Sequence, residues 1–134
     1  MEETIKVKVR FCETDALGHV NNTSYFIYFE EARVQFFEKM GQSMNSDSWP
    51  FILASASCDF LSQAYFNQEL VIATTISKVG GKSFSLEHLV EDAKDGKAVA
   101  KGKASIVFYN FTHQKSEDIP DELRRQLEAC LAHA

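Results

Sequence analysis

The sequence has few cysteines and no long apolar run, and both absences exclude whole classes of protein. Its cysteines are Cys12, Cys58 and Cys130, an odd number without a CxxC pair or metal-like spacing. They are typical of free thiols in a cytoplasmic protein rather than of a disulfide framework. No apolar stretch approaches the roughly 20 residues that span a bilayer, and no apolar signal core follows the N-terminus. We therefore expect a soluble chain that does not enter a membrane.

An excess of basic residues and the common nucleotide-binding motifs are also missing. The formal net charge is −5 at pH 7, whereas generic nucleic-acid binding uses a broad basic surface. The chain contains no GxSxG, P-loop or GxGxxG sequence, so α/β-hydrolase and nucleotide-binding functions have no support. His88, His113 and His133 are dispersed, and we expect no metal site.

The chain is the size of one domain. Its 134 residues, 45 % of them hydrophobic, are enough for a sizeable core, and we expect one domain over residues 1–134. Near the N-terminus, four apolar residues alternate with Lys and Arg in the period of a strand with one buried face. They are Ile5, Val7, Val9 and Phe11.

A long helix is predicted over residues 24–40. Its apolar side chains recur at helical spacing and are Phe26, Phe29, Ala32, Phe36, Phe37 and Met40. Asn21 or Asn22 can cap its start, and Gly41 can end it. Residues 42–50 are expected to form a polar loop.

Most of the remaining chain is strand-like. Segment 51–66 is too long for one typical strand, which predicts a bend or bulge within it. An antiparallel meander with turns at Gly80-Gly81 and Asp95-Gly96 is predicted to follow, with strands over residues 69–79, 82–94 and 97–110. A short C-terminal helix is expected through about residue 132, opened by Asp118 as a cap and by Pro120 in its first turn.

The last long strand carries small side chains on one face. These are Ala98, Ala100, Gly102 and Ala104, and they would let the sheet approach a bulky neighbour, for which the Phe-rich helix is the obvious candidate. One helix on one face of an antiparallel sheet is an α+β arrangement. Periodicity alone leads no further.

Several motifs together resemble the hotdog-fold acyl-CoA thioesterases, specifically the 4-hydroxybenzoyl-CoA thioesterase family and its bacterial acyl-CoA branch. The specific part of the similarity is Thr14-Asp15-Ala16-Leu17-Gly18-His19-Val20-Asn21-Asn22 with Tyr25 and Tyr28-Phe29-Glu30-Glu31-Ala32-Arg33. Val79-Gly80-Gly81-Lys82-Ser83, Gln114-Lys115 and Ile119-Pro120 extend it over nearly the whole chain. The chain departs from the family after Tyr65, where Phe66-Asn67-Gln68-Glu69 replaces the usual Pro followed by a Gly-Asp turn.

The resemblance implies a curved antiparallel sheet wrapped around one long central helix. It also implies a homodimer or homotetramer with active sites between subunits, in which the Asp loop of one subunit meets strands of another. The expected activity is hydrolysis of acyl-CoA or acyl-carrier-protein thioesters to free acid and thiol. No cofactor is expected, since coenzyme A is part of the substrate.

In the family the Asp of this loop is the catalytic carboxylate, and the matching residue is Asp15. An ionised carboxylate can attack a thioester carbonyl or deprotonate a water beside it, and the sequence leaves both roles open. The family's polarising amide matches that of Asn22, at the positive end of the helix. Gly18 lets the loop turn at low steric cost. Taken without the motif, Asp15 would be read as an Asx-turn residue that merely shapes the loop.

Two neighbours of Asp15 have alternative roles. His19 could orient water or protonate the leaving thiolate, or it could only pack the loop. Tyr25 could line the acyl pocket, or pack with its hydroxyl at the surface. On the helix, Glu30 or Glu31 could reach a neighbouring site, although we favour a solvated face or a pairing with Arg33.

Coenzyme A carries phosphates, so a thioesterase should offer basic groups near the pocket mouth. The candidates are Lys78 and Lys82, beside Ser83 in the Gly-Gly hairpin, and Lys101 and Lys103 on the last long strand. Each of them could also be a solubilising surface charge.

Two other functions fit the same fold. A hydratase or dehydratase of acyl thioesters would need a His with an acid on the long helix, and residues 24–40 contain no His. A non-catalytic acyl-thioester binding protein would not need a carboxylate beside the carbonyl. The length of the acyl group, its aromatic or aliphatic nature and its carrier are left open.

Overall fold

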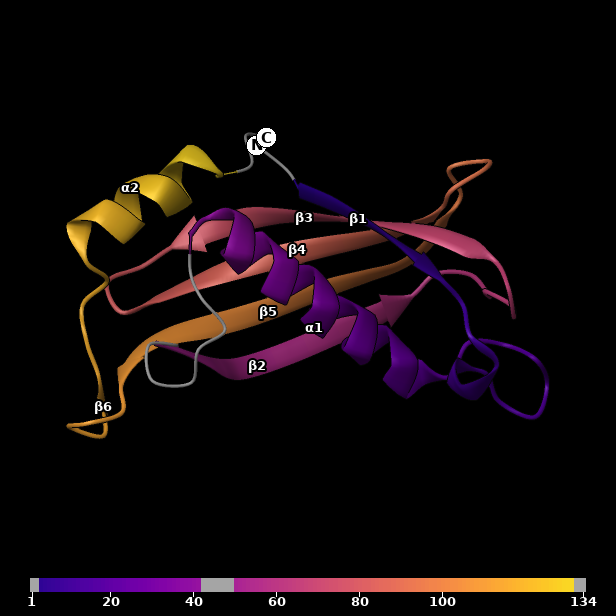
Figure 1. Ribbon diagram of the computed structural model, residues 1–134, viewed down its shortest axis with the longest axis horizontal. Coiled ribbons are helices and arrows are strands. Elements are labelled where there is room, and N and C mark those ends of the chain that lie inside the picture. Colours follow the sequence, from indigo (N-terminus) through magenta and orange to yellow (C-terminus); the bar gives the residue numbers. More distant parts are fainter. Residues whose placement is uncertain (1–2, 42–49, 132–134) are drawn as a thin grey trace.

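The computed structural model describes residues 3–41 and 50–131. Its core is a six-stranded antiparallel sheet in the order β1-β3-β4-β5-β2, with the short β6 paired to the end of β5 (Figure 1). The strands are β1 (Glu3–Lys8), β2 (Phe51–Phe60), β3 (Glu69–Val79), β4 (Ser83–Asp92), β5 (Ala98–Asn110) and β6 (Lys115–Ser116). The helices are the 3₁₀ turn η1 (Phe11–Glu13), α1 (Asn22–Lys39) and α2 (Asp121–Ala129). No helix in the described ranges is long and apolar enough to cross a membrane.

The antiparallel meander is confirmed. β3, β4 and β5 pair in sequence order, and the buried positions of each strand alternate with more exposed ones as expected for a sheet with one covered face. Gly96 adopts φ +72° in the β4–β5 turn, a conformation that glycine accepts at low cost. In the β3–β4 turn, the Gly80 amide donates to the Ser83 carbonyl over 2.7 Å.

The first strand is shorter than predicted. β1 ends at Lys8, and the 3₁₀ turn η1 follows, so Phe11 lies outside the sheet with 78 % of its surface exposed. The local reason is Glu13, whose carboxylate accepts the backbone N–H and the guanidinium of Arg10. These bonds satisfy the backbone in a tight turn instead of a continued ladder.

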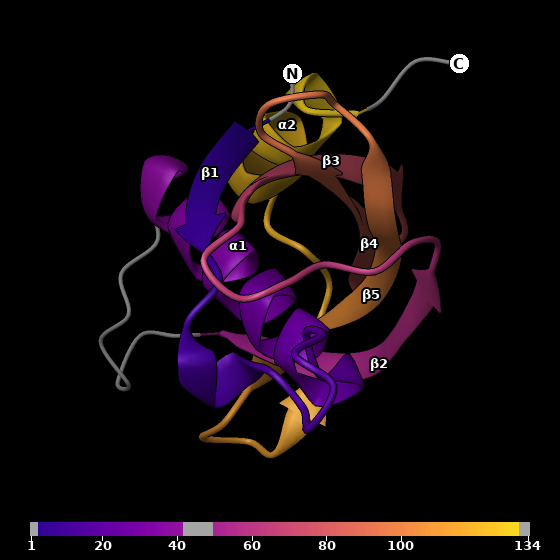
Figure 2. The same ribbon diagram turned by 90° about the vertical axis from the view of Figure 1, so that its right-hand side faces the viewer.

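Helix α1 lies on the concave side of the sheet, which curls around it (Figure 2). Its buried face includes Tyr25, Tyr28, Phe29, Ala32 and Phe36, at intervals of three and four residues. The prediction that Phe26 belongs to this face is wrong: Phe26 is 38 % exposed, whereas Tyr25, four residues before Phe29, is 3 % exposed. Both positions neighbour Phe29 on the helix, and packing against the sheet buries Tyr25.

Small residues of β5 accommodate α1, as the sequence predicted. Ala100, Gly102 and Ala104 are buried, and a Cβ built on Gly102 would meet the ring of Phe29 at 2.5 Å. A glycine is therefore required there by close packing.

The helix ends agree in part with the predicted caps. Asn21 is the N-cap of α1, although its side chain makes no capping hydrogen bond, and Gly41 follows the helix with φ +87°. Helix α2 begins at Asp121 after Pro120, so the cap predicted at Asp118 is wrong, and the helix ends at Ala129. The chain is instead fixed before α2 by buried Ile119, whose amide donates to the Gly81 carbonyl over 2.9 Å.

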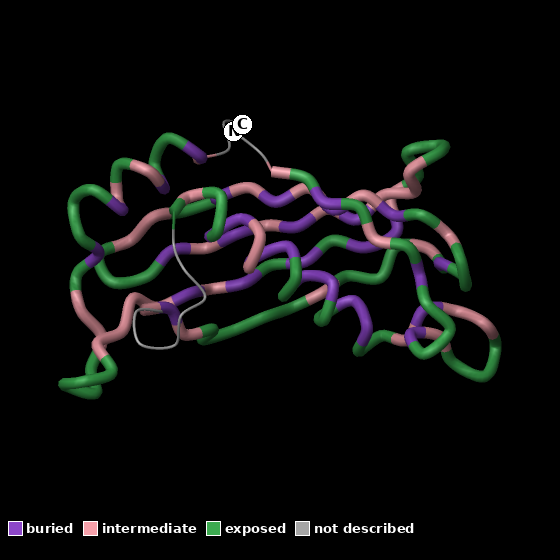
Figure 3. Tube along the Cα trace, viewed as in Figure 1, coloured by how far each residue is buried: buried purple, intermediate pink, exposed green. Residues whose placement is uncertain are grey.

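Strand β2 forms one edge of the sheet. A register shift between Leu53 and Ser55 confirms the irregularity that the length of segment 51–66 predicted. The strand is exposed along most of its length, as Figure 3 shows. The predicted polar loop falls mainly on residues 42–49, which lie outside the described residues.

Candidate active site

The Asp loop, residues 14–21, joins η1 to α1 and closes on itself. Asp15 donates its backbone N–H to the His19 carbonyl over 2.8 Å, and Gly18 donates to the Asp15 carbonyl over 3.0 Å. Gly18 has φ +81°, so the turn uses the freedom for which the glycine was singled out. The loop returns the chain to the first residue of α1.

The Asp15 carboxylate shapes this loop with one of its two oxygens. Oδ1 accepts the backbone N–H groups of Leu17 at 2.8 Å and His19 at 3.2 Å, which is the Asx-turn geometry. Among the described residues, no hydrogen bond or ion pair involves Oδ2. Asp15 is exposed, so the turn fixes the carboxylate and leaves one oxygen available to react.

His19 is held by its main chain and by ring packing. It forms an isolated antiparallel bridge with Tyr65, and the two rings meet edge to face with centroids 5.1 Å apart. Its contacts with Asp15 run through backbone atoms. The packing role that the sequence allowed for His19 is thus visible in the structure.

Helix α1 starts beside this loop with Asn22, which is exposed. The first N–H groups of a helix have no partner within it and attract negative charge. Asn21, one residue earlier, donates its own N–H to the Glu13 carbonyl over 2.9 Å. The Asn22 amide is therefore at the positive end of α1, next to a fixed anchor.

Tyr25 is buried, contrary to a position with its hydroxyl at the surface. Only 3 % of its surface is exposed, and its ring lies 5.5 Å from that of Phe60 and 6.0 Å from that of Tyr28, between centroids. Burial raises the pKa of Tyr25 to about 12, which keeps the hydroxyl neutral. The ring forms a wall between the start of α1 and the end of β2.

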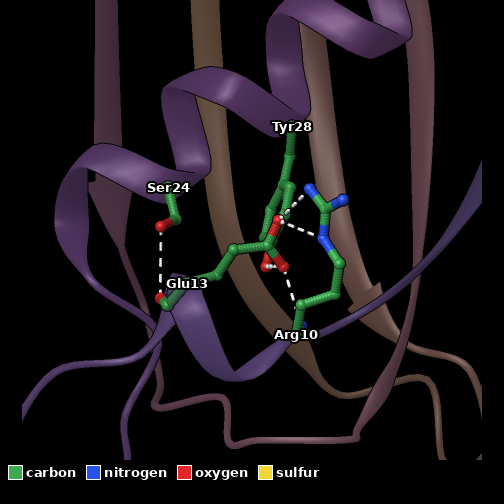
Figure 4. A network of polar contacts seen from close by, with 4 residues as sticks. All are labelled: Arg10, Glu13, Ser24 and Tyr28. Atoms are coloured by element: carbon green, nitrogen blue, oxygen red, sulfur yellow. Dashed lines mark hydrogen bonds and ion pairs between the residues drawn. The ribbon is translucent and has the colours of Figure 1, made fainter.

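Glu13 anchors the Asp loop, and the sequence analysis missed it (Figure 4). It is 4 % exposed, and its carboxylate accepts hydrogen bonds from the Arg10 guanidinium at 2.7 and 3.0 Å and from the Tyr28 hydroxyl at 2.9 Å. Its carbonyl also accepts the Ser24 hydroxyl. Burial alone would raise the pKa of Glu13, but the hydrogen bonds from Arg10 and Tyr28 outweigh it and lower that pKa. The one available signal was an Arg and a Glu three residues apart.

The predicted coenzyme A contacts lie far from Asp15 in one chain. Lys78, Lys82 and Ser83 belong to the β3–β4 hairpin, at the end of the sheet opposite the Asp loop (Figure 1). Arg124 of α2 donates to the carbonyls of Gly80 and Gly81 in that hairpin, at 3.0 and 3.2 Å. A single subunit therefore does not gather these residues around the carboxylate.

Lys101 lies on another surface again. It is exposed on β5 between buried Ala100 and buried Gly102, so its side chain is on the sheet face that points away from α1. Its register partners are Asp59 of β2 and Leu89 of β4.

A second polar cluster is buried under α1. His88 of β4 is 1 % exposed; its Nδ1 is 2.8 Å from the Thr74 hydroxyl, and its ring stacks on Phe29 with centroids 5.0 Å apart. Burial and the nearby charge of Arg33 lower the pKa of His88 to about 3. Among the residues that the structure describes, none forms a hydrogen bond with its Nε2.

Arg33 lines a cavity of about 360 Å³ between α1 and β2. The other lining residues are Glu30, Val34, Phe37, Phe51, Leu53 and Ile106. A wider groove of about 910 Å³ runs between α1 and β1 and is lined by charges of both signs. Within the described ranges, no group of three or more His, Cys, Asp or Glu side chains is placed to hold a metal ion.

Known proteins are similar to this chain in sequence. YsmA of Bacillus subtilis is 36 % identical over 91 % of this chain and 82 % of its own length. The long-chain acyl-CoA thioesterase FadM of Escherichia coli is 28 % identical over 92 % of this chain and 95 % of FadM.

Solved structures of thioesterases have a similar fold. A predicted thioesterase from Bacillus stearothermophilus is 27 % identical, covers 100 % of this chain and 99 % of its own, and has a TM-score of 0.93. A Thermus thermophilus thioesterase complexed with coenzyme A and Zn is 28 % identical over 92 % of this chain and 95 % of its own, with a TM-score of 0.81. The profile of the thioesterase-like superfamily matches residues 9–127. The resemblance noted in the sequence is confirmed, and the chain belongs to the thioesterase-like superfamily.

Proposed function

We propose that this protein hydrolyses acyl-CoA thioesters, with Asp15 as nucleophile or general base and the Asn22 amide as the oxyanion donor. The observation that carries the proposal is the carboxylate fixed through Oδ1 with Oδ2 available, in the loop that opens onto the start of α1. The match to the long-chain acyl-CoA thioesterase FadM, which covers 95 % of FadM, supports the substrate class. We propose a cytoplasmic location from the free thiols.

The chemistry requires one base or nucleophile and one site for negative charge. Oδ2 takes a proton from water, or attacks the thioester carbon itself. The carbonyl oxygen becomes an oxyanion, which the amide at the positive end of α1 stabilises. Collapse of this intermediate breaks the carbon–sulfur bond and releases the coenzyme A thiolate. In the general-base route it leaves the free acid; in the nucleophilic route it leaves an acyl–Asp15 anhydride, which a water molecule then hydrolyses to the free acid and the Asp15 carboxylate. His19, half-exposed beside Asp15, is the nearest candidate to protonate the thiolate.

A second copy of the chain completes the site in this proposal. β2 is an edge strand with a largely exposed surface, and pairing it with its own copy across a two-fold axis gives the antiparallel ladder that edge strands favour. The two-fold reverses the copy, so its β3–β4 hairpin lies at the end where this subunit has its Asp loop. Lys78, Lys82 and Ser83 of the partner would then meet the coenzyme A phosphates, and Lys101 lies on the joined sheet.

The proposed dimer also has the hotdog architecture. Each α1 is the central helix of its own curved sheet, and the joined sheets hold two helices side by side. Dimers could pair further into a tetramer. Asp15, exposed in a single chain, would be covered by the partner, which keeps bulk water away from the carbonyl.

The test is thiol release from a series of acyl-CoA and acyl-carrier-protein substrates. Asp15→Asn should lose at least a hundredfold in turnover, in line with the usual contribution of an acid or base. Asp95→Asn is the matched control, since Asp95 is also exposed and its Oδ1 accepts the amide two residues later, that of Lys97, at 2.9 Å. The control should keep wild-type turnover.

Each other outcome favours another function. Undiminished turnover by Asp15→Asn would refute the mechanism. Loss of the conjugated absorbance of an enoyl-thioester without thiol release would indicate a hydratase. Tight binding of acyl thioesters, with no thiol release from any substrate of the series, would indicate a binding protein.

A further inference from the structure

Arg33 is a buried cation that forms no ion pair with any residue the structure describes. It lies on α1 with 9 % of its surface exposed, and no hydrogen bond or ion pair joins its side chain to any residue in the described ranges. Burial lowers the pKa of Arg33, and the charge of Glu30, one helical turn earlier, opposes this shift only in part. Glu30 is exposed and does not form an ion pair with Arg33. A neighbouring buried side chain, His88, is neutral under ordinary conditions and offers no negative charge.

A guanidinium in such a position is unfavourable unless something pairs with it. Removing a charge from water is costly, and protein interiors normally offset this cost with a partner or a bound ligand. Arg33 faces the cavity between α1 and β2, whose other lining residues are five apolar side chains and the exposed Glu30. The arrangement is one buried cation in a mostly apolar pocket with a carboxylate at its rim, and such a pocket suits an apolar ligand whose anionic end reaches past the rim to the cation.

We propose that this cavity takes the far end of the acyl group and that Arg33 binds a carboxylate there, so that thioesters of dicarboxylic acids are the preferred substrates. The proposal rests on the thioesterase function proposed above and names its substrate class. A guanidinium matches a carboxylate by two parallel N–H···O bonds. Val34, Leu53 and Ile106 contribute the apolar wall along which the methylene chain would lie.

The two-subunit site brings this pocket to the carbonyl. Within one chain, Asn22 and Arg33 are separated by about 16 Å along the helix axis, at 1.5 Å per residue. When β2 pairs over its full length with its copy, Phe51 of the partner subunit lies opposite Phe60. Phe60 contacts Tyr25 at the start of α1, whereas Phe51 lines the Arg33 pocket. The partner's Arg33 pocket would therefore flank the Asp loop and receive an acyl group of short or medium length.

The experiment compares pairs of acyl-CoA substrates of equal chain length, one ending in a methyl group and one in a carboxylate. For wild type, kcat/KM should be higher with the carboxylate at one or more lengths. Arg33→Gln should lower the carboxylate-to-methyl ratio of kcat/KM by roughly ten- to hundredfold, the usual effect of a charge-assisted hydrogen bond. Arg33→Lys should keep part of the preference, and Glu30→Gln, which removes a competing charge at the rim, should increase it.

Arg125→Gln is the control for loss of a positive charge, because Arg125 is exposed on α2 away from the cavity. It should leave the ratio unchanged. A wild-type protein that prefers the methyl-terminated substrate at every length would overturn the proposal. So would an Arg33→Gln protein, of unchanged oligomeric state, that loses both substrates equally.

A binding measurement separates this failure from failure of the thioesterase function. Dissociation constants for the same pairs, measured by calorimetry on the Asp15→Asn protein, do not depend on turnover. Tighter binding of the carboxylate-terminated member, lost on adding Arg33→Gln, would support the pocket even if no thiol were released. Equal binding of both members would refute it.

Discussion

The ring of Phe29 rests directly on Gly102, so that a Cβ at position 102 would lie 2.5 to 2.9 Å from three of its carbon atoms. Gly102→Ala should therefore force α1 away from β5 and destabilise the protein by about 1–3 kcal/mol, as overpacking of a core does. The midpoint of chemical unfolding measures this loss.

Two further variants show whether the ring is the cause. Gly81→Ala, where nothing lies within 4 Å of an added Cβ, should change the unfolding free energy by less than about 0.5 kcal/mol. Adding Phe29→Leu to Gly102→Ala should recover part of the loss, because it removes the ring carbons that clash. Strictly additive losses would show that the contact is not responsible.

Glu13 should matter more for stability than the arginine that binds it. Glu13→Ala leaves the Tyr28 hydroxyl buried without its acceptor, and we expect a cost of about 2–3 kcal/mol in unfolding free energy. Arg10→Ala should cost clearly less than Glu13→Ala, because the Arg10 side chain is 72 % exposed and its ion pair is screened by solvent. Equal losses in denaturant unfolding would contradict this ranking.

The low pKa of buried His88 predicts that the protein loses stability in mild acid. The pKa of His88 is about 3 in the folded protein, whereas an ordinary histidine has a pKa near 6.5. Between these values the unfolded chain binds a proton that the folded chain does not, so the unfolding free energy falls as the pH falls. At pH 5 the effect amounts to about 2 kcal/mol relative to pH 7.

Variants assign that slope to one residue. His88→Leu removes the titrating group from the core, so its unfolding free energy should fall less between pH 7 and pH 5 than that of wild type. His113→Gln alters an exposed histidine and should keep the wild-type slope. If His88→Leu also keeps the wild-type slope, the acid sensitivity lies with other groups, such as Glu13.

Mixed dimers test whether the site is shared between subunits. If Asp15 of one subunit works with Arg33 of the other, a dimer of one Asp15→Asn chain and one Arg33→Gln chain contains one doubly defective site and one intact site. Refolding the two variants together should then restore turnover of the carboxylate-terminated substrate, in proportion to the heterodimer formed. No recovery would place both residues in the same subunit's site.

The sequence predicted best those features that depend on local pattern. Alternating residues such as Leu70, Ile72 and Ile76 defined β3, and the small residues around Gly102 correctly indicated where α1 approaches. The Asp loop is contiguous with the start of α1, so its placement followed from adjacency. The prediction placed Phe26 on the buried face of α1 in the position that Tyr25 takes. Both residues fit an apolar stripe of finite width, and only packing against the sheet decides between them.

The other features of the site depend on tertiary contacts between segments that are distant in sequence. Glu13, Arg33 and His88 belong to residue types that are usually exposed or only partly buried. Their types outweighed the local signal, although His88 alternates with Leu86 and Val90 and Arg33 lies four residues after Phe29. Each is buried because elements distant in sequence cover it. The distance between the β3–β4 hairpin and the Asp loop likewise follows from the length of the strands, which places the two motifs at opposite ends of the sheet.

The place of β2 at the edge of the sheet also has a consequence for synthesis of the chain. β2 leaves the ribosome before β3 and β4, yet its ladder partner is β5, which emerges after both. Until then the strand has two unpaired edges, with Leu53 and Phe60 available to other chains. We expect the β3–β4–β5 meander to form first, because its contacts are local, and nascent chains to be most prone to aggregation before β5 is complete.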